Sequence, residues 1–340
     1  MRRWWRVAAG VVTGVPAGVL AGWAVVRWSG FEPGWPWVPV VAFTPYAGGA
    51  AVVLLLVTGL LRLRWPAVAA LVAVAGLGLA VLPRALPDAA TSSAPPASAV
   101  SSAVPAAEAS PAGRAAGEAR RLRVLSANLL VGSADPAALV ALVDRLRPDV
   151  LALQELTPSA AERLERAGLR RALPYAVARP EQGAAGSALY ARHPLTPAAG
   201  PPPGTFGQAA GVLERPGGVR VEVVSVHPCA LALSEARPCW RRELDALPRA
   251  GGSARVLAGD FNATLDHLPL RRLLASGYRD AADATGQGLS PTWPARGWGG
   301  LPGVAIDHVL APARMPVREY GVHALAGSDH RAVLAELALP

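Results

Sequence analysis

Lysine is absent from this chain, and cysteine and charged residues are scarce. All 33 basic residues are Arg, two of the 340 residues are Cys, and 17% carry a charge, against about 25% in average soluble domains. Two Cys exclude a disulfide-rich scaffold, and a hydrophobic content of 52% excludes a disordered chain. A mean hydropathy of +0.30 argues against a wholly soluble protein.

Positive charge is concentrated in the first quarter of the chain. Residues 1–86 hold seven Arg and one acid, a net charge of +6, whereas residues 87–340 hold 26 Arg against 23 acids, a net charge of +3. Affinity for nucleic acid comes largely from basic residues that neutralise phosphates. The near-balanced charge of the larger part therefore makes nucleic acid a less favoured partner than the overall pI of 10.8 suggests.

Three long uncharged runs lie in this first quarter, at residues 7–26, 38–61 and 65–83. A helix of about 20 apolar residues is long enough to cross a bilayer. Seven of the ten Trp lie in this region, mostly at the ends of the runs, where the membrane interface favours Trp. We predict a membrane domain of residues 1–86 with three transmembrane helices and the lipid bilayer as its partner. A cleaved signal peptide is the less favoured alternative, because the first run exceeds the usual length and two more runs follow.

The placement of Arg predicts how these helices are oriented. Three Arg lie within residues 2–6, and Arg62 and Arg64 lie between the second and third runs. The positive-inside rule assigns these segments to the cytoplasm. Three crossings then place the rest of the chain outside, with Arg84 as an exception to the rule. The predicted localisation is the cell membrane, multi-pass, with an extracytoplasmic catalytic domain.

The remaining chain divides into a linker and one domain. Residues 87–119 are mostly Ala, Ser and Pro, a composition typical of a flexible linker. Residues 120–340 are long enough to bury one core. Their early strands and helices alternate and later stretches are rich in strands, which predicts an α/β domain with more than one sheet.

Polar side chains stand at the predicted ends of many of these strands. In open α/β sheets, ligands bind at such strand ends. Each residue alone is typical of a turn or a cap, but the group contains amides, carboxylates and imidazoles together. Its members are Asn128, Glu155, His227, Asp260, Asn262, Asp307, Asp329 and His330.

The order of these motifs resembles that of the endonuclease/exonuclease/phosphatase superfamily, which includes DNase I-like nucleases, neutral sphingomyelinases and inositol phosphatases. The resemblance covers about residues 121–339. It rests on Asn128, Gln154-Glu155, Gly259-Asp-Phe-Asn262, Ile306-Asp307-His308 and Ser328-Asp329-His330. It implies an α/β fold, a four-layer sandwich of two packed mixed β-sheets with outer helices, here preceded by three transmembrane helices.

The resemblance also implies a metal site. Glu155 would be the principal ligand of Mg²⁺ (or Mn²⁺), with Asn128 and Asp329 nearby, and oxygen donors of this kind suit a hard cation. Members of the superfamily often carry an acid shortly after the first Asn. Here Leu129 and Leu130 follow instead, so that extra metal contact is absent.

The resemblance assigns the five other residues to catalysis. Asp260 would orient or deprotonate the attacking water, and Asn262 would hydrogen-bond the phosphate or this water. His330, kept cationic by Asp307, would stabilise charge that develops on the phosphate. His227 would face the leaving oxygen as an acid or a donor.

Three further features have open interpretations. Cys229 and Cys239 form either a disulfide or two free thiols, and an extracytoplasmic location favours the disulfide. Thr292-Trp-Pro294 is either a substrate platform or a segment with a packed surface Trp. His308 is expected to be an ordinary strand residue, because its side chain points away from that of Asp307.

The sequence therefore predicts a membrane-tethered, metal-dependent phosphoesterase or phosphatase that hydrolyses a phosphate ester or pyrophosphate outside the cell. A lipid-linked substrate of the cell envelope is favoured, because the spans keep the site near the bilayer. The architecture is also similar to that of actinobacterial teicoplanin-resistance membrane proteins, which are implicated in cell-wall lipid-carrier chemistry. The alternatives are an extracellular DNase I-like nuclease and a non-catalytic resistance module.

Overall fold

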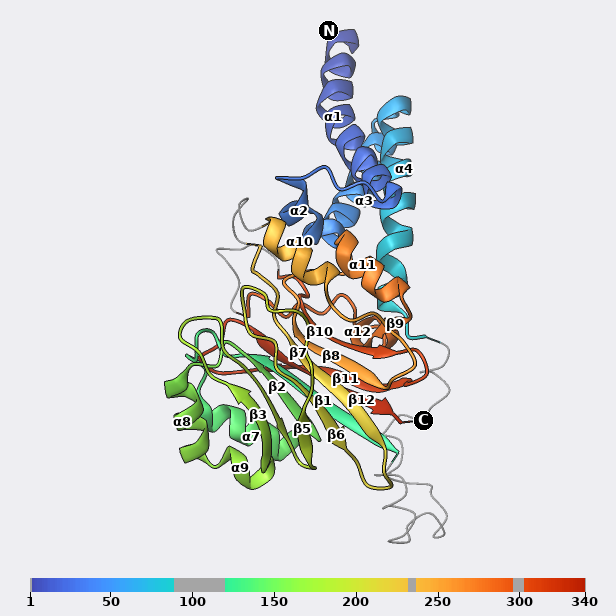
Figure 1. The fold of residues 1–340 in the computed structure, drawn as a ribbon. Helices are drawn as coiled ribbons and strands as arrows, with labels where there is room; N and C mark the ends of the chain where they lie inside the picture. Colours follow the sequence, from blue (N-terminus) through green and yellow to red (C-terminus); the bar gives the residue numbers. More distant parts are fainter. Residues whose placement is uncertain (1, 89–119, 232–236, 296–302, 340) are drawn as a thin grey trace, which may run out of the picture.

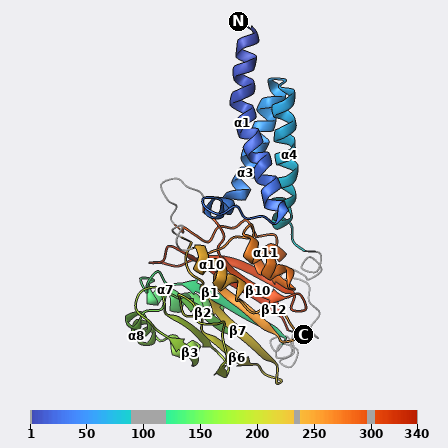
Figure 2. The same cartoon turned by 45° about the horizontal axis from the view of Figure 1, so that its top comes forward.

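The computed structural model describes residues 2–88, 120–231, 237–295 and 303–339. We call residues 2–88 the N-terminal bundle and residues 120–339 the C-terminal domain. The bundle stands on one end of the domain, and Figures 1 and 2 show the same arrangement from two directions. Most of the predicted linker, residues 89–119, lies outside the described residues. Its first two residues pair with the C-terminal domain, Pro87 with Thr285 and Asp88 with Ala284.

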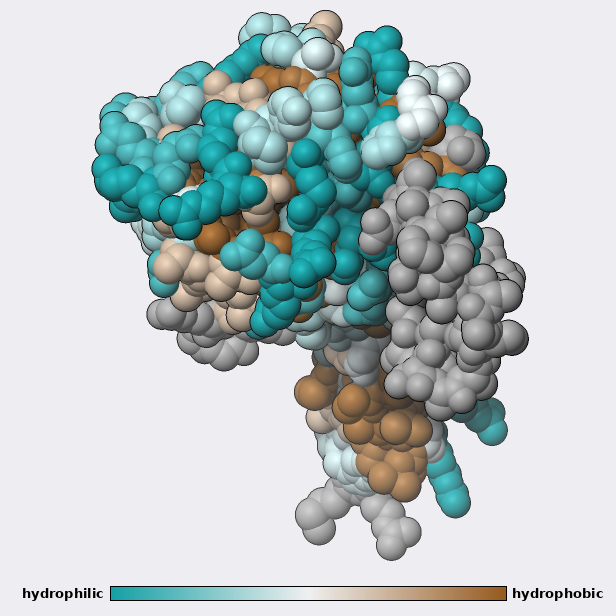
Figure 3. Space-filling view, turned by 90° about the horizontal axis from the view of Figure 1, so that it is seen from below, coloured by the Kyte–Doolittle hydropathy of each residue, from teal (hydrophilic) through white to brown (hydrophobic). Residues whose placement is uncertain are grey.

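The bundle contains the three predicted apolar segments, all of them helical. Its elements are α1 (Arg2–Ser29), α2 (Trp37–Val40), η1 (Val41–Phe43), α3 (Thr44–Leu60), α4 (Arg64–Val81) and η2 (Leu82–Ala85). Three stretches, Trp4–Ser29, Trp37–Leu60 and Arg64–Ala85, are long and apolar enough to cross a membrane. Hydrophobic atoms gather where the bundle projects beyond the largely hydrophilic face of the domain in Figure 3.

Two sheets form the centre of the C-terminal domain. The strands of the first are β1 (Arg121–Asn128), β2 (Val150–Gln154), β3 (Tyr175–Arg179), β4 (Ser187–Ala191), β11 (Val317–Ala324) and β12 (Arg331–Ala338). Those of the second are β5 (Leu195–Pro197), β6 (Ala210–Glu214), β7 (Arg220–Val226), β8 (Arg255–Asp260), β9 (Tyr278–Asp280) and β10 (Asp307–Pro312). The orders are β11-β12-β1-β2-β4-β3 and β5-β6-β7-β8-β10-β9. The pairs β1–β2 and β7–β8 are parallel, and the others are antiparallel.

Helices cover the outer face of each sheet. The first sheet packs against α7 (Pro136–Leu146), α8 (Pro158–Ala167) and α9 (Leu169–Ala172), and the second against α10 (Arg237–Asp245) and α11 (Leu268–Ala275). The short α12 (Ala281–Ala284) contributes to the core between the sheets. Because both faces of each sheet are covered, β2 and β4 are buried along their whole length. This four-layer sandwich confirms the predicted fold class.

The two parallel pairs direct their carboxyl ends to one region of the domain. Asn128 at the end of β1 is in register with Gln154 at the end of β2, and Val226 of β7 with Gly259 of β8. A Cβ at Gly259 would lie 2.0 Å from the carbonyl oxygen of Val226. Only glycine therefore allows β7 and β8 to approach closely just before Asp260.

This close approach predicts that Gly259→Ala is destabilising. The new methyl group must push β8 away from β7, and overpacking of this kind costs about 1–3 kcal/mol of folding free energy. Gly252→Ala is the matched control in the loop before β8, because a Cβ there has nothing within 4 Å. Thermal unfolding of both variants in detergent checks the prediction. Equal midpoints for the two variants would contradict it.

Candidate active site

The side chain of Asn128 joins the two sheets at their carboxyl ends. Its Nδ2 donates to Glu155 Oε1, on the segment after β2, and to Asp260 Oδ2, at the end of β8, both at 3.1 Å. The backbone N–H of Val131 donates to Glu155 Oε2 at 2.6 Å. One amide therefore fixes the spacing between a carboxylate of the first sheet and a carboxylate of the second.

His330 forms a buried ion pair with Asp307. Its Nδ1 donates to both carboxylate oxygens of Asp307, at 2.9 and 3.1 Å, and its Nε2 lies 3.7 Å from Asp260 Oδ2. Burial alone would lower the pKa of His330. The charges of Asp307 and Asp260, together with the hydrogen bond, outweigh burial and raise the pKa to about 10. The imidazole is therefore cationic at neutral pH.

His227 also lies beside Asp260, but its imidazole is uncharged. Its Nε2 lies 3.7 Å from Asp260 Oδ2 and 3.8 Å from Glu155 Oε1. Complete burial lowers its pKa, and the positive charge of His330 opposes its protonation further. The ring of Phe206 stacks on the imidazole with centroids 4.5 Å apart. His227 is therefore a neutral imidazole that stacks on Phe206.

Asp260 is the carboxylate on which these contacts converge. Burial is the main cause that raises its pKa, against the opposing charge of His330. Its Oδ1 accepts from the backbone N–H of Asn262 at 2.8 Å. Glu155 and Asn262 have φ of +59° and +48°, backbone conformations that non-glycine residues rarely adopt and that cluster at functional sites. A carboxylate of raised pKa is a stronger base.

The oxygen donors here fit a divalent cation. Trp293 Nε1 donates to Asp329 Oδ2 at 3.0 Å, while Asp329 Oδ1 is buried without a hydrogen-bond partner in the described part of the chain. Glu155 supplies a second carboxylate. Asp260, Asp307 and His330 also offer atoms within 4.8 Å of one another, but a metal needs an unprotonated imidazole, and His330 is cationic. His330 is therefore a poor ligand, and the carboxylates of Glu155 and Asp329 stay the predicted ligands.

The structure brings the predicted residues together with one difference in orientation. Contacts join all eight, and Asp329 lies 4.0 Å from His330. The side chain of Asn262 turns to the carbonyl oxygen of Pro228 at 3.2 Å, so only its backbone contacts Asp260. His308 points away and bonds Asp280 and the Ala263 carbonyl, each at 2.8 Å. The sequence analysis missed Phe206, which lies in a segment without strand periodicity.

Two further motifs flank this group. Cys229 and Cys239 form a disulfide between the segment after His227 and α10. Trp293 is half-buried, with its ring centroid 6.3 Å from that of His330. Trp293 therefore packs beside the site and hydrogen-bonds one of its residues, Asp329.

A scan against protein-family models matches residues 125–330 to the Endonuclease/Exonuclease/phosphatase family. The chain belongs to this family. Its members are generally metal-dependent hydrolases that act on phosphodiester bonds. The matched span begins in β1 and ends at His330, so it contains all eight predicted site residues. No curated protein matches the chain in sequence.

Solved structures of low sequence identity are similar to this chain, and one of them has a TM-score above 0.5. An AP endonuclease from Archaeoglobus fulgidus is 14% identical, with a TM-score of 0.51, over 63% of this chain and 98% of its own. An endonuclease/exonuclease/phosphatase from Beutenbergia cavernae is 21% identical, with a TM-score of 0.49, over 65% and 72%. Truncated TDP2 from Caenorhabditis elegans is 17% identical, with a TM-score of 0.48, over 64% and 98%.

The His330–Asp307 pair predicts a loss of stability at alkaline pH. The pKa of His330 in the folded protein, about 10, exceeds its ordinary value of 6.5. The pair therefore stabilises the fold fully below pH 6.5 and progressively less as the pH rises towards 10. Asp307→Asn should flatten this dependence, because His330 then loses its main partner. Thermal unfolding between pH 6 and 10 measures it, with the exposed Asp245→Asn as the control; parallel curves for wild type and Asp307→Asn would refute the assignment.

Proposed function

We propose that this protein is a membrane-anchored, metal-dependent phosphoesterase that hydrolyses a phosphate or pyrophosphate group carried by a membrane lipid, on the outer side of the membrane. The observation that carries this proposal is the short path from the site to the bundle. Asn262 precedes Asp266, which pairs with Arg27 and Arg84 of the bundle, and Asp307 follows Gly303, whose carbonyl accepts from Tyr46 of α3. Four residues span at most about 14 Å.

This distance favours a lipid substrate over a soluble one. The site is held beside the ends of helices that are apolar enough to enter a bilayer, where lipid headgroups are concentrated. Anchoring raises the effective concentration of a membrane substrate without any added contact. The resemblance to actinobacterial teicoplanin-resistance membrane proteins points to the same substrate class.

The orientation of the bundle supports an extracytoplasmic site. The segments that contact the C-terminal domain include the end of α1, α2, the start of α3 and η2. The opposite end of the bundle carries the loop with Arg62 and the start of α4 at Arg64. The positive-inside rule assigns this Arg-bearing end to the cytoplasm. Arg84, the exception in the sequence, is buried and paired with Asp266, so it does not report on topology.

The site residues divide the chemistry among them. Asp260 orients the attacking water and takes its proton, which its raised pKa favours. His330 is a fixed cation that hydrogen-bonds the phosphate as negative charge develops on it. His227, neutral and close to Asp260, faces the leaving oxygen. A divalent ion held by Glu155 and Asp329 would supply charge neutralisation at the phosphate when bound.

A nuclease is the second candidate, and the fold shared with an AP endonuclease keeps it open. The charge of residues 87–340 is only +3, which offers little of the counterion-release affinity that DNA binding needs. The proximity of the bundle gives no advantage for DNA. Both observations favour the lipid substrate.

A substrate panel tests the proposed function. Full-length protein in lipid vesicles with Mg²⁺ should hydrolyse a polyprenyl pyrophosphate or another lipid phosphate faster than plasmid DNA. Asp260→Asn should lower kcat by about 10²–10³, the cost of losing one electrostatic partner in the transition state. Glu155→Gln should weaken Mg²⁺ binding and so raise the Mg²⁺ concentration that half-maximal activity requires. Efficient nicking of plasmid with no activity on lipid phosphates would replace this proposal with the nuclease.

Reporter fusions test the orientation. A reporter fused after residue 63, in the loop that follows α3, should read as cytoplasmic. A reporter fused after residue 100, in the segment that follows the bundle, should read as external, because three crossings precede it. A cytoplasmic signal at residue 100 would contradict the orientation and remove the oxidising environment that a disulfide requires.

A further inference from the structure

We propose that the N-terminal bundle completes the active site by holding the loop of residues 261–267 in place through Asp266. This loop, which we call the catalytic loop, directly follows Asp260 and contains Asn262. Asp266 would act as a positioning residue and would not touch the substrate. The kinetic part of the inference rests on the proposed function, whereas its structural part does not.

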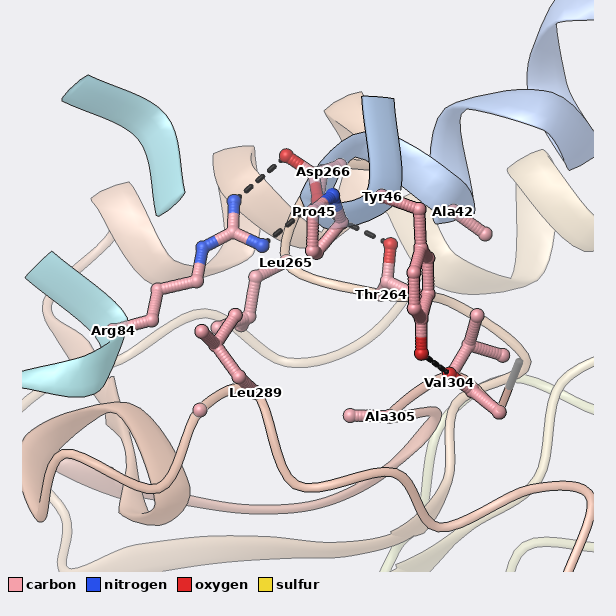
Figure 4. Close-up of a pocket in the computed structure, with 12 residues that line it drawn as sticks. Ala42, Pro45, Tyr46, Arg84, Thr264, Leu265, Asp266, Leu289, Val304 and Ala305 are labelled. Atoms are coloured by element: carbon pink, nitrogen blue, oxygen red, sulfur yellow. Dashed lines mark hydrogen bonds and ion pairs between the residues drawn. The ribbon is translucent and has the colours of Figure 1, made fainter. Parts of the chain in front are cut away.

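Asp266 is held by two arginines that come from different helices of the bundle. Arg27 Nε, near the end of α1, lies 2.8 Å from Asp266 Oδ1. Arg84, in η2, donates to Oδ1 from Nη2 at 2.7 Å and to Oδ2 from Nη1 at 2.8 Å. Figure 4 shows Arg84 and Asp266 facing each other across this junction. The Asp266 side chain is fully buried and each Arg side chain is 7% exposed.

These contacts keep Asp266 ionised in a buried position. Burial alone would raise its pKa, but the hydrogen bonds and charges of Arg84 and then of Arg27 outweigh burial and lower it. Both arginines that hydrogen-bond this carboxylate lie on the bundle, and Arg271 of α11 adds positive charge from the C-terminal domain. Breaking a buried ion pair from one side leaves uncompensated charge and is strongly destabilising locally. The position of Asp266 is thus strictly coupled to that of the bundle.

His267, the next residue, forms a second link of the same kind. Its Nδ1 accepts from the backbone N–H of Thr264 at 2.8 Å, and its Nε2 donates to the carbonyl oxygen of Val38 in α2 at 2.8 Å. Val38 is fully buried among apolar residues of the C-terminal domain. Burial lowers the pKa of His267 to about 4, so the neutral imidazole can both accept and donate. The bundle therefore forms hydrogen bonds with two adjacent residues of the catalytic loop.

The other end of the catalytic loop lies in the active site and needs such support. Asn262 has φ of +48°, a costly conformation for a non-glycine residue that persists only when its surroundings impose it. Its carbonyl accepts from Trp240 Nε1 at 2.9 Å, and the carbonyl of Ala263 accepts from His308 at 2.8 Å. Hydrogen bonds from within the domain and from three residues of the bundle thus hold the loop on both sides. The backbone N–H of Asn262 orients Asp260 together with the side chain of Asn128.

The junction offers a matched control. Arg241 of α10 lies 3.4 Å from Glu32, in the segment after α1. This ion pair also joins bundle and domain, but it does not involve the catalytic loop. If the bundle were only an anchor, Asp266→Asn and Arg241→Gln would have similar effects on the site.

The experiment compares these variants in the full chain, in detergent micelles, by amide hydrogen exchange and steady-state kinetics on bis-p-nitrophenyl phosphate with Mg²⁺. Asp266→Asn should speed exchange in residues 261–267 by about tenfold or more, the factor expected for one lost charged hydrogen bond, without affecting β1 or β12. It should lower kcat at least about tenfold and change KM little, because substrate contacts remain. Arg241→Gln should do neither.

Arg84→Lys keeps the positive charge but loses the bidentate hydrogen bond to Asp266. This variant replaces Asp266→Asn in the experiment if Asp266→Asn does not fold. It should give a smaller change of the same kind, again confined to the catalytic loop. Wild-type exchange in the loop, or faster exchange with unchanged kcat, would overturn the inference. If the wild-type protein hydrolyses no substrate, the proposed function fails, and hydrogen exchange alone then decides whether the bundle holds the loop.

Discussion

The contact between the two sheets at the Asn128 amide is the interaction on which the site depends. It bonds Glu155 of the first sheet and Asp260 of the second at equal distances. Both acids stand at the carboxyl ends of parallel strand pairs, and glycine at position 259 lets the second pair close beneath Asp260. Without this shared edge, the carboxylates of Glu155 and Asp260 would belong to separate surfaces.

The electrostatics of the site follow from where negative charge is buried. Asp307 hydrogen-bonds His330 and makes it a cation. His227 lies at the same 3.7 Å from Asp260 but has no carboxylate of the described residues within hydrogen-bond distance, and it remains neutral. Two imidazoles within reach of the same carboxylate thus have different protonation states. One can stabilise an anionic phosphate, and the other can approach a leaving oxygen without repelling the cation.

The junction with the bundle makes the position of the site a property of the whole chain. A flexible linker would keep the domain within about 30 Å of the membrane, since a coil spans roughly 5–6 Å × √n. The structure instead seats the domain directly against the helix ends through Arg27, Arg84 and Val38. Such a contact fixes the distance and the angle of the site relative to the bundle, which a flexible linker cannot do.

The sequence by itself determined the three apolar helices, most of the strands and the eight polar residues at strand ends. These depend on local periodicity and on motif order, which a linear chain displays. The strands β5 and β9 have three residues each, which is too few for a distinctive periodicity. Only the tertiary structure identified Phe206 and explained Arg84. Asp266 pairs with Arg27 and Arg84, which precede it by 239 and 182 positions in the sequence. Contacts over such separations depend on how the elements pack.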